Sequence, residues 1–193
     1  MELAEVVLFL HITVALAAFS IATVIHTGEW SMRRGTTVAE LRTWAGVIRR
    51  FGQLFPIMIG LLLVLGAWLV SLSDGKFDWG DGWVASAVVA LVILGAIGGA
   101  VLDPAAKRLV AQLSAAPDGP VTPELRTAAC NPVIWVLGHL STGLALGVVF
   151  AMTTKPSTGG ALAVLVVGSG LGALIGYLGA RSGTARVAAI ASA

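Results

Sequence analysis

Three histidines carry the most distinctive chemistry of this sequence, because only 11% of its residues have charged side chains. His11 and His139 lie inside long apolar runs, whereas His26 stands beside Thr27 and close to Glu29. Histidine is the commonest metal ligand and changes charge near neutral pH, and ionisable residues within membrane-crossing helices are usually functional. The chemistry to consider is therefore metal or haem binding, proton transfer, or hydrogen bonding between helices.

Two histidines on different helices can hold one haem iron between them. Counted by helical rise, His11 lies about 12 Å and His139 about 20 Å from the same face of the bilayer, a difference that a helix tilt of about 20° partly absorbs. We therefore take His11 and His139 as candidate cofactor ligands, with haem b as the cofactor. Alternatively, these histidines bond to neighbouring hydroxyls, as polar side chains do between membrane helices, or they carry protons or ions. His26 is expected near the interface and is the weakest of the three candidates.

Signatures of other chemistry are missing from the sequence. It contains no H-E-x-x-H, G-x-S-x-G or Walker A pattern and no C-x-x-C-H haem attachment site. No acidic residue falls in the middle of an apolar run, so a carboxylate-driven transporter lacks its usual proton site. These observations disfavour an enzyme and leave small-solute or ion transport as a further alternative.

The composition places these residues in a membrane protein. Hydrophobic residues make up 57% of the chain, and its charged fraction is far below the quarter that is typical of soluble domains. Backbone groups in lipid must bond within their own segment, which predicts an all-α bundle in a lipid bilayer, and nucleic-acid binding is not expected. We predict a single transmembrane domain over residues 1–193 with five spans, at Leu3–Thr27, Gly52–Leu72, Trp83–Leu102, Val133–Met152 and Ala161–Ala180.

The basic residues predict the orientation of these spans. Of the 12 lysines and arginines, only Lys76 and Lys155 fall in the connections on the N-terminal side of the membrane. Cytoplasmic loops carry an excess of such residues, so we expect the N-terminus outside, the C-terminus in the cytoplasm, and the protein in the inner membrane of a bacterial cell. The ten on the other side are Arg33, Arg34, Arg42, Arg49, Arg50, Lys107, Arg108, Arg126, Arg181 and Arg186.

The first basic connection should contain a helix over about residues 38–51. Thr37 and Glu40 have the spacing of a capping box, and apolar residues then recur at intervals of three and four. We expect this helix to lie at the membrane surface, with Trp44 and the guanidinium groups of Arg42, Arg49 and Arg50 near lipid headgroups or a docked partner. The connection before the fourth span should hold two short helices, started by Asp103-Pro104 and by Thr122-Pro123.

Glycines recur once per helical turn in the last two spans. Such small residues mark the faces where membrane helices approach closely, so we expect packing through Gly143, Gly147, Gly168, Gly172 and Gly176. The contact can lie within one chain, in a homo-oligomer or in a heteromeric membrane complex. Our leading interpretation is a non-enzymatic accessory or assembling subunit, and the alternative is a haem- or metal-binding membrane protein.

Several short segments resemble a family of uncharacterised bacterial integral membrane proteins, similar to the copper-resistance D-like membrane proteins. They are "LFLHITVALAAF", "WAGVIRRFGQLFPIMIGLLLVLGAWL", "LDPAAKRL" and "FAMTTKPS", and the resemblance covers about residues 1–157. By position, His11 matches the histidine of the family's first span, and Lys155-Pro156 its "KP". The resemblance implies metal handling, although Met58 and Met152 form no methionine cluster of the kind that suits copper transport.

Overall fold

The chain is helical throughout the part that the structure describes, which is the backbone of residues 2–191 and the side chains of residues 2–181. The side chain of Arg186 lies outside this part. Within residues 2–191 there is no strand, which confirms the all-α class. In the computed structural model the elements are α1 (Leu3–Arg34), α2 (Val38–Gly52), α3 (Phe55–Ser71), α4 (Gly82–Ile97), the π-helical turn η1 (Gly98–Leu102), α5 (Asp103–Ala115), α6 (Pro123–Ala129), α7 (Pro132–Thr154) and α8 (Thr158–Ala191).

Five helical stretches are long and apolar enough to cross a membrane, and each contains one of the predicted spans to within a residue. Three of them are longer than predicted because short, more polar helices continue the apolar ones: α2 precedes α3, α5 follows α4 through η1, and α6 precedes α7. The stretches are Leu3–Arg34, Val38–Ser71, Gly82–Ala115, Pro123–Thr154 and Thr158–Arg181.

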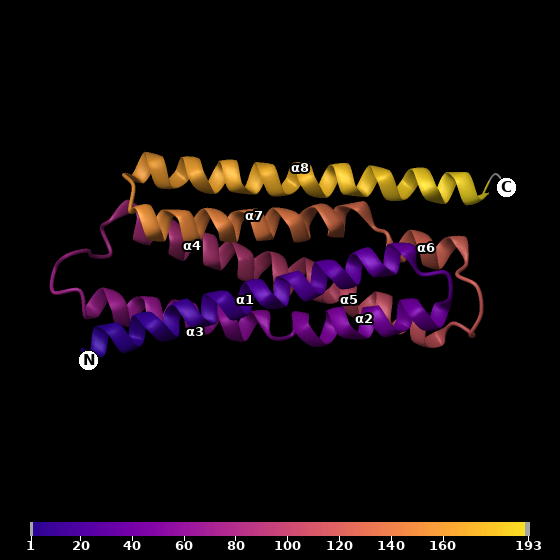
Figure 1. Ribbon diagram of the computed structural model, residues 1–193, viewed down its shortest axis with the longest axis horizontal. Coiled ribbons are helices and arrows are strands. Elements are labelled where there is room, and N and C mark those ends of the chain that lie inside the picture. The colour runs from indigo at the N-terminus through magenta and orange to yellow at the C-terminus, as the bar shows by residue number, and fades with distance from the viewer. Residues whose placement is uncertain (1, 192–193) are drawn as a thin grey trace.

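The long helices run side by side along one axis in two layers (Figure 1). In one layer α1 packs along α2 and α3, and in the other α7 packs on α8 and α4. The α1–α2 and α5–α6 connections lie at one end of the bundle, and the α3–α4 and α7–α8 connections lie at the other (Figure 1). We call the first the arginine-rich end, because Arg33, Arg34, Arg42 and Arg126 gather there.

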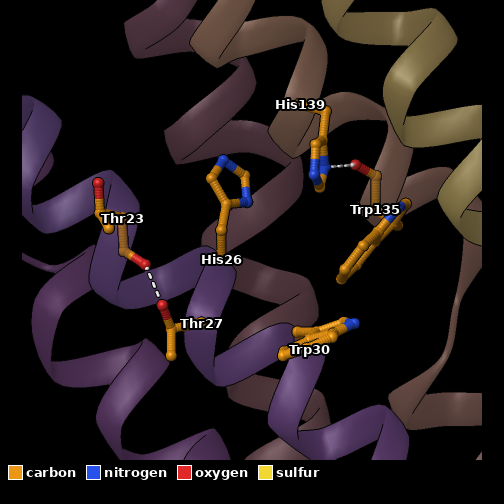
Figure 2. Close-up of a pocket in the computed structure, with 6 residues that line it drawn as sticks. All are labelled: Thr23, His26, Thr27, Trp30, Trp135 and His139. Atoms are coloured by element: carbon orange, nitrogen blue, oxygen red, sulfur yellow. Dashed lines mark hydrogen bonds between the residues drawn. The ribbon is translucent and has the colours of Figure 1, made fainter.

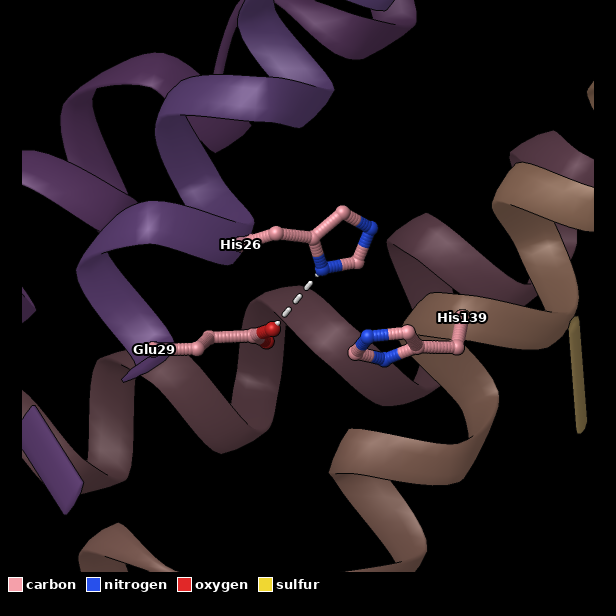
Figure 3. Close-up of side chains that lie close together, drawn as sticks. All are labelled: His26, Glu29 and His139. Carbon is pink, nitrogen blue, oxygen red and sulfur yellow. Dashed lines mark hydrogen bonds and ion pairs between the residues drawn. The ribbon is translucent and has the colours of Figure 1, made fainter. Parts of the chain in front are cut away.

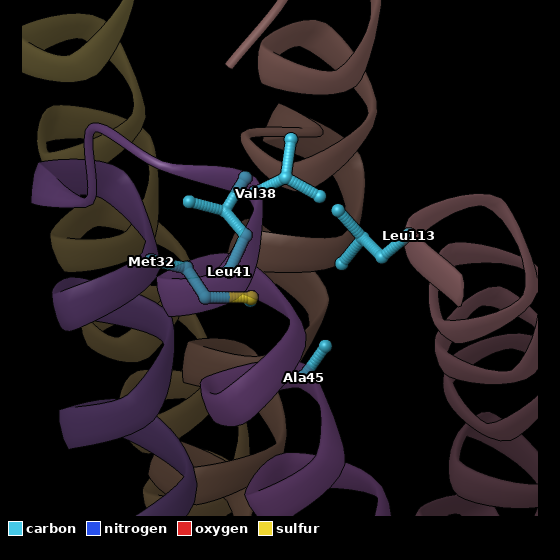
Figure 4. Close-up of a cluster of buried hydrophobic side chains, with 5 residues drawn as sticks. All are labelled: Met32, Val38, Leu41, Ala45 and Leu113. Atoms are coloured by element: carbon cyan, nitrogen blue, oxygen red, sulfur yellow. The ribbon is translucent and has the colours of Figure 1, made fainter. Parts of the chain in front are cut away.

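The helix expected at the membrane surface forms within the expected bounds, and one of its faces packs on neighbouring helices. Thr37 and Glu40 make the predicted capping box at the start of α2. The apolar face of α2, which includes Leu41 and Ala45, is buried against Met32 of α1 and Leu113 of α5 (Figure 4). Trp44 packs against the same cluster. Because α1 continues to Arg34 and α5 extends α4, both supply apolar surface that covers this face of α2.

Two arginines of this end cap neighbouring helices. The last carbonyls of a helix have no partner within it, and cationic side chains often donate to them. Arg42 donates through Nε to the Leu113 carbonyl at 3.2 Å and through Nη2 to that of Ala116 at 3.0 Å, at the end of α5. Arg126 donates to the carbonyls of Met32 and Gly35 at the end of α1. Arg42 is therefore held by protein groups, whereas Arg50 at the end of α2 is exposed.

Candidate functional site

The polar residues of α1 and α7 meet between these helices near the arginine-rich end. His26, Glu29 and Arg33 follow one another at helical spacing, so they share one face of α1. They lie opposite Trp135 and His139 of α7, with the His26 and His139 rings 4.3 Å apart between centroids (Figure 3). The two helices run in opposite directions, and each histidine lies roughly 11 Å from the end of its own helix. Equal depth from that end is what brings them together.

The hydrogen bonds of His139 assign its proton. Its Nδ1 lies 2.9 Å from the carbonyl oxygen of Trp135, one turn earlier in α7. A carbonyl oxygen only accepts, so Nδ1 carries the hydrogen of the neutral ring and Nε2 keeps a free lone pair. A backbone carbonyl that orients the ring in this way is the usual support for a histidine that binds a metal through its other nitrogen.

The contacts of His26 fit two arrangements of hydrogens. Its Nε2 lies 2.8 Å from the Thr142 hydroxyl, which is 3.2 Å from the carbonyl oxygen of Gly138 and has one hydrogen to donate to either. When the hydroxyl donates to Nε2, Nδ1 of His26 donates to Oε2 of Glu29 at 3.0 Å; when it donates to Gly138, Nδ1 of a neutral His26 has a lone pair that faces Oε2. In the second arrangement the two lone pairs repel unless a cation lies between them. The cation is either a proton shared by the pair or a metal ion.

The three donor groups converge as a metal site requires. One ligand atom each from His26, Glu29 and His139 lies within 4.8 Å of the others. Bonds of about 2.0–2.1 Å to a tetrahedral ion place ligand atoms roughly 3.3 Å apart, close to the 3.0 Å between His26 and Glu29. The side chains of this pair are 24% and 13% exposed, so the site is largely screened from solvent.

A pocket of about 390 Å³ leads to this cluster (Figure 2). Its wall includes both histidines and Trp135, whose indole ring lies 4.7 Å from the His139 ring between centroids. The remaining wall comes from one face of α1, through Thr23, Thr27 and Trp30. The cluster is therefore reachable from outside the bundle by a small ligand or an ion.

Arg33 borders the cluster on the side of α8. Its guanidinium carbon lies 3.8 Å from the centroid of the Trp135 ring, and its Nη1 donates to the carbonyl of Gly179 at 2.9 Å. The other two nitrogens, Nε and Nη2, are buried and have no hydrogen-bond partner among the described residues.

The structure does not bring His11 and His139 together. His11 faces Gly66 of α3, and about four turns of α1, or roughly 22 Å, separate it from His26 and hence from His139. A haem iron cannot bridge that distance. His26, the weakest candidate from the sequence, is the partner of His139. Counting from the arginine-rich ends of the two helices would have indicated the pair, as would the spacing of His26, Glu29 and Arg33.

The five glycines singled out in the sequence lie in the contact between α7 and α8. A Cβ atom added to Gly143 would collide with the backbone of Gly168, and one added to Gly147 would lie 2.9 Å from the carbonyl oxygen of Val164. A Cβ on Gly176 would lie 2.9 Å from Cα of Val136, and one on Gly172 would collide with the carbonyl of His139. The contact lies within one chain, and it fixes the backbone of α7 at the position of His139.

Comparison with known proteins identifies the family. Residues 5–156 match the family described as "Predicted integral membrane protein (DUF2269)". The match covers most of the chain, so the chain belongs to this family and is an integral membrane protein. No curated protein and no solved structure matches it. The matched residues include α1 and α7 and hence the whole His26, Glu29 and His139 cluster.

Proposed function

We propose that this integral membrane protein binds a divalent transition-metal ion between α1 and α7, with His26, Glu29 and His139 as ligands. The observation that carries the proposal is that one ligand atom each from His26, Glu29 and His139 lies within 4.8 Å of the others, with Nδ1 of His26 and Oε2 of Glu29 3.0 Å apart. The role we assign is non-enzymatic: the protein holds or hands over the ion.

The ligand set indicates the kind of ion. Two imidazoles and one carboxylate suit zinc, ferrous iron, cobalt, nickel and cupric copper, whereas cuprous copper prefers thiolates and thioethers. Three protein ligands leave at least one coordination position open toward the pocket. That open position favours an ion that is exchanged over one that is locked into the fold.

A haem b between the same histidines is less well supported. Rings whose centroids are 4.3 Å apart are in van der Waals contact and leave no room for an iron with its flat porphyrin. The glycine faces of α7 and α8 are packed against each other. An accessory subunit of a heteromeric complex or a homo-oligomer would therefore have to bind its partner through another surface.

We also propose that the arginine-rich end lies in the cytoplasm and that the membrane is the inner membrane of a bacterial cell. The support is the excess of lysine and arginine in the connections at that end. In this orientation the metal site lies near the cytoplasmic face, where an ion would be received from or released to the cell interior.

Metal binding to the detergent-purified chain tests the proposal. Zinc titrated calorimetrically should bind one ion per chain, and His139→Ala, His26→Ala and Glu29→Gln should each weaken binding at least about 100-fold, since even outer-shell partners of metal ligands matter 10–100-fold. His11→Ala removes a histidine of the same helix and should leave binding unchanged. Equal zinc binding by all four variants would refute the site. Failure of the unmodified chain to bind zinc, cobalt or nickel would leave a proton as the cation between His26 and Glu29.

A further inference from the structure

A long cavity separates the two helix layers. It measures about 1680 Å³ and runs between α1 and α3 on one side and α4 and α7 on the other. Glu5 and Arg33 both line it, and on one straight helix they are roughly 42 Å apart, more than the hydrocarbon thickness of about 30 Å. Small-molecule pockets are typically about 300–1,000 Å³. We call this cavity the interlayer slot.

The walls of the slot are apolar along most of its length, with side chains that include Phe19, Ile59, Leu62, Leu91, Leu94 and Val148. In a bilayer the hydrophobic effect does not press such walls together, because lipid tails are as apolar as the side chains. Space between helices is then filled by hydrocarbon. The walls therefore fit acyl chains and offer little to a polar ligand.

The arginine-rich end of the slot carries donors without acceptors. Nε and Nη2 of Arg33 are buried and lack hydrogen-bond partners among the described residues, although Arg33 lines the slot. Buried charged donors are costly when unpaired. An anion in the slot beside Arg33 offsets this positive charge.

The charges around this end also favour an anion. Arg49, Lys107 and Arg108 also line the slot. The carboxylates at this end are Glu29 and Asp103, of which Glu29 is paired with His26 and Asp103 with Lys107 at 2.6 Å. Because Lys107 is paired with Asp103, three basic groups of the slot, Arg33, Arg49 and Arg108, have no carboxylate partner among the described residues.

From these observations we infer that the interlayer slot holds an anionic phospholipid of the surrounding bilayer. Its acyl chains lie along the apolar walls, and its phosphate lies among the basic side chains that line the slot, which are Arg33, Arg49 and Arg108. This lipid site does not depend on a metal at His26, Glu29 and His139, although the two sites are neighbours on α1. It gives the protein a bound lipid in the leaflet at the arginine-rich end.

The lipid retained by the full chain tests the inference. The protein is exchanged into nanodiscs that contain equal amounts of phosphatidylglycerol and phosphatidylcholine, extracted gently into detergent and weighed by native mass spectrometry. Phosphatidylglycerol should be retained in preference, and Arg33→Gln should reduce its retention at least about fivefold, the contribution of one basic residue near acidic lipid. Arg34→Gln is the matched control: Arg34 is exposed and stacks on Trp30 outside the slot, and this variant should retain lipid normally.

A second pair of variants tests the slot without touching Arg33. A Cβ atom at Gly98 or at Gly170 would meet open space, but Gly98 lines the slot and Gly170 lies on α8 outside it. Gly98→Phe should therefore reduce lipid retention and Gly170→Phe should not. Equal retention of both lipids, no retained lipid, displacement by inorganic phosphate alone, or a second copy of the chain in place of lipid would each overturn the inference. Chelation of metal should leave lipid retention unchanged, which separates this result from that of the metal titration.

Discussion

The backbone carbonyl of His139 lies so close to Gly172 that a single carbon added at position 172 would collide with it. Gly172→Leu should therefore push α8 away from α7 and destabilise the protein by roughly 1–3 kcal/mol, as overpacking of a close contact does. Thermal unfolding in detergent measures the loss. Gly170→Leu, on a face of α8 with open space, serves as the control. Unchanged stability of the Gly172 variant would mean that this face of α8 turns toward lipid.

Trp135 should report occupation of the metal site. Its ring lies 4.7 Å from the His139 ring between centroids, near enough for a paramagnetic ion at His139 to quench its fluorescence by contact. We expect cupric or nickel ions to quench part of the emission of the unmodified protein and to lose that effect in Trp135→Phe. Trp68→Phe removes an exposed indole on α3 and should keep the quenching. Loss of quenching in both variants, or in neither, would contradict the assigned site.

Metal retention should fall as the solution is acidified. The imidazole nitrogens of His26 and His139 must be unprotonated to bind an ion, and protons compete for the same lone pairs. Bound zinc should therefore be lost progressively below about pH 6 and regained on return to neutral pH. Zinc content after desalting at each pH gives the profile. A site whose occupancy is constant down to about pH 4 would not use these histidines.

Arg126 should matter for stability more than an exposed arginine does. Its guanidinium donates to carbonyls of Met32, Arg33 and Gly35 at the end of α1. Arg126→Gln should cost about 2 kcal/mol, the usual value for hydrogen bonds to a charged group. The free energy of unfolding is measured for this variant and for Arg50→Gln. Because the Arg50 side chain is exposed, the difference between the two variants gives the contribution of the cap. Equal stability of the two variants would show that water replaces Arg126 at these carbonyls.

The proposed orientation predicts which residues a membrane-impermeant thiol reagent reaches. After Cys130→Ala, a cysteine placed at Lys76 should be labelled in intact cells, because the proposed orientation puts the α3–α4 connection outside. One placed at Asp118, in the α5–α6 connection, should be labelled only after the membrane is opened. The reverse pattern would invert the orientation and move the metal site to the outer face.

Much of the fold follows from short-range signals in the sequence. Thr37 with Glu40 and Thr122 with Pro123 begin helices as predicted, because a cap depends on residues only three positions apart. The glycines one turn apart in the last two spans predict a close helix contact, which α7 and α8 make. The C-terminal turns of α1 do not follow from hydropathy, since Thr27 to Arg34 are too polar for a lipid-facing span and their cover by α2 and α6 is a tertiary feature.

The pairing of His26 with His139 could not be predicted from hydropathy alone. When the depth of each histidine is counted from the outer end of its helix, His139 pairs with His11. In the structure, however, the C-terminal end of α1 lies level with the N-terminal end of α7, and α1 continues to Arg34, beyond its apolar part. That extension places His26 opposite His139. The interlayer slot could not be predicted from the sequence at all, because its walls have the same apolar composition as surfaces that pack tightly.

The arginine caps of α1 and α5 make orientation and folding inseparable in this chain. Arg42 and Arg126 belong to the group of positive charges that supports the proposed orientation, and their guanidinium groups also donate hydrogen bonds to carbonyls at helix ends. Moving these charges to the opposite side, as in experiments that invert membrane proteins, would also remove the hydrogen bonds that cap two helix termini. An inverted chain could therefore insert with all five spans and still fail to assemble its bundle.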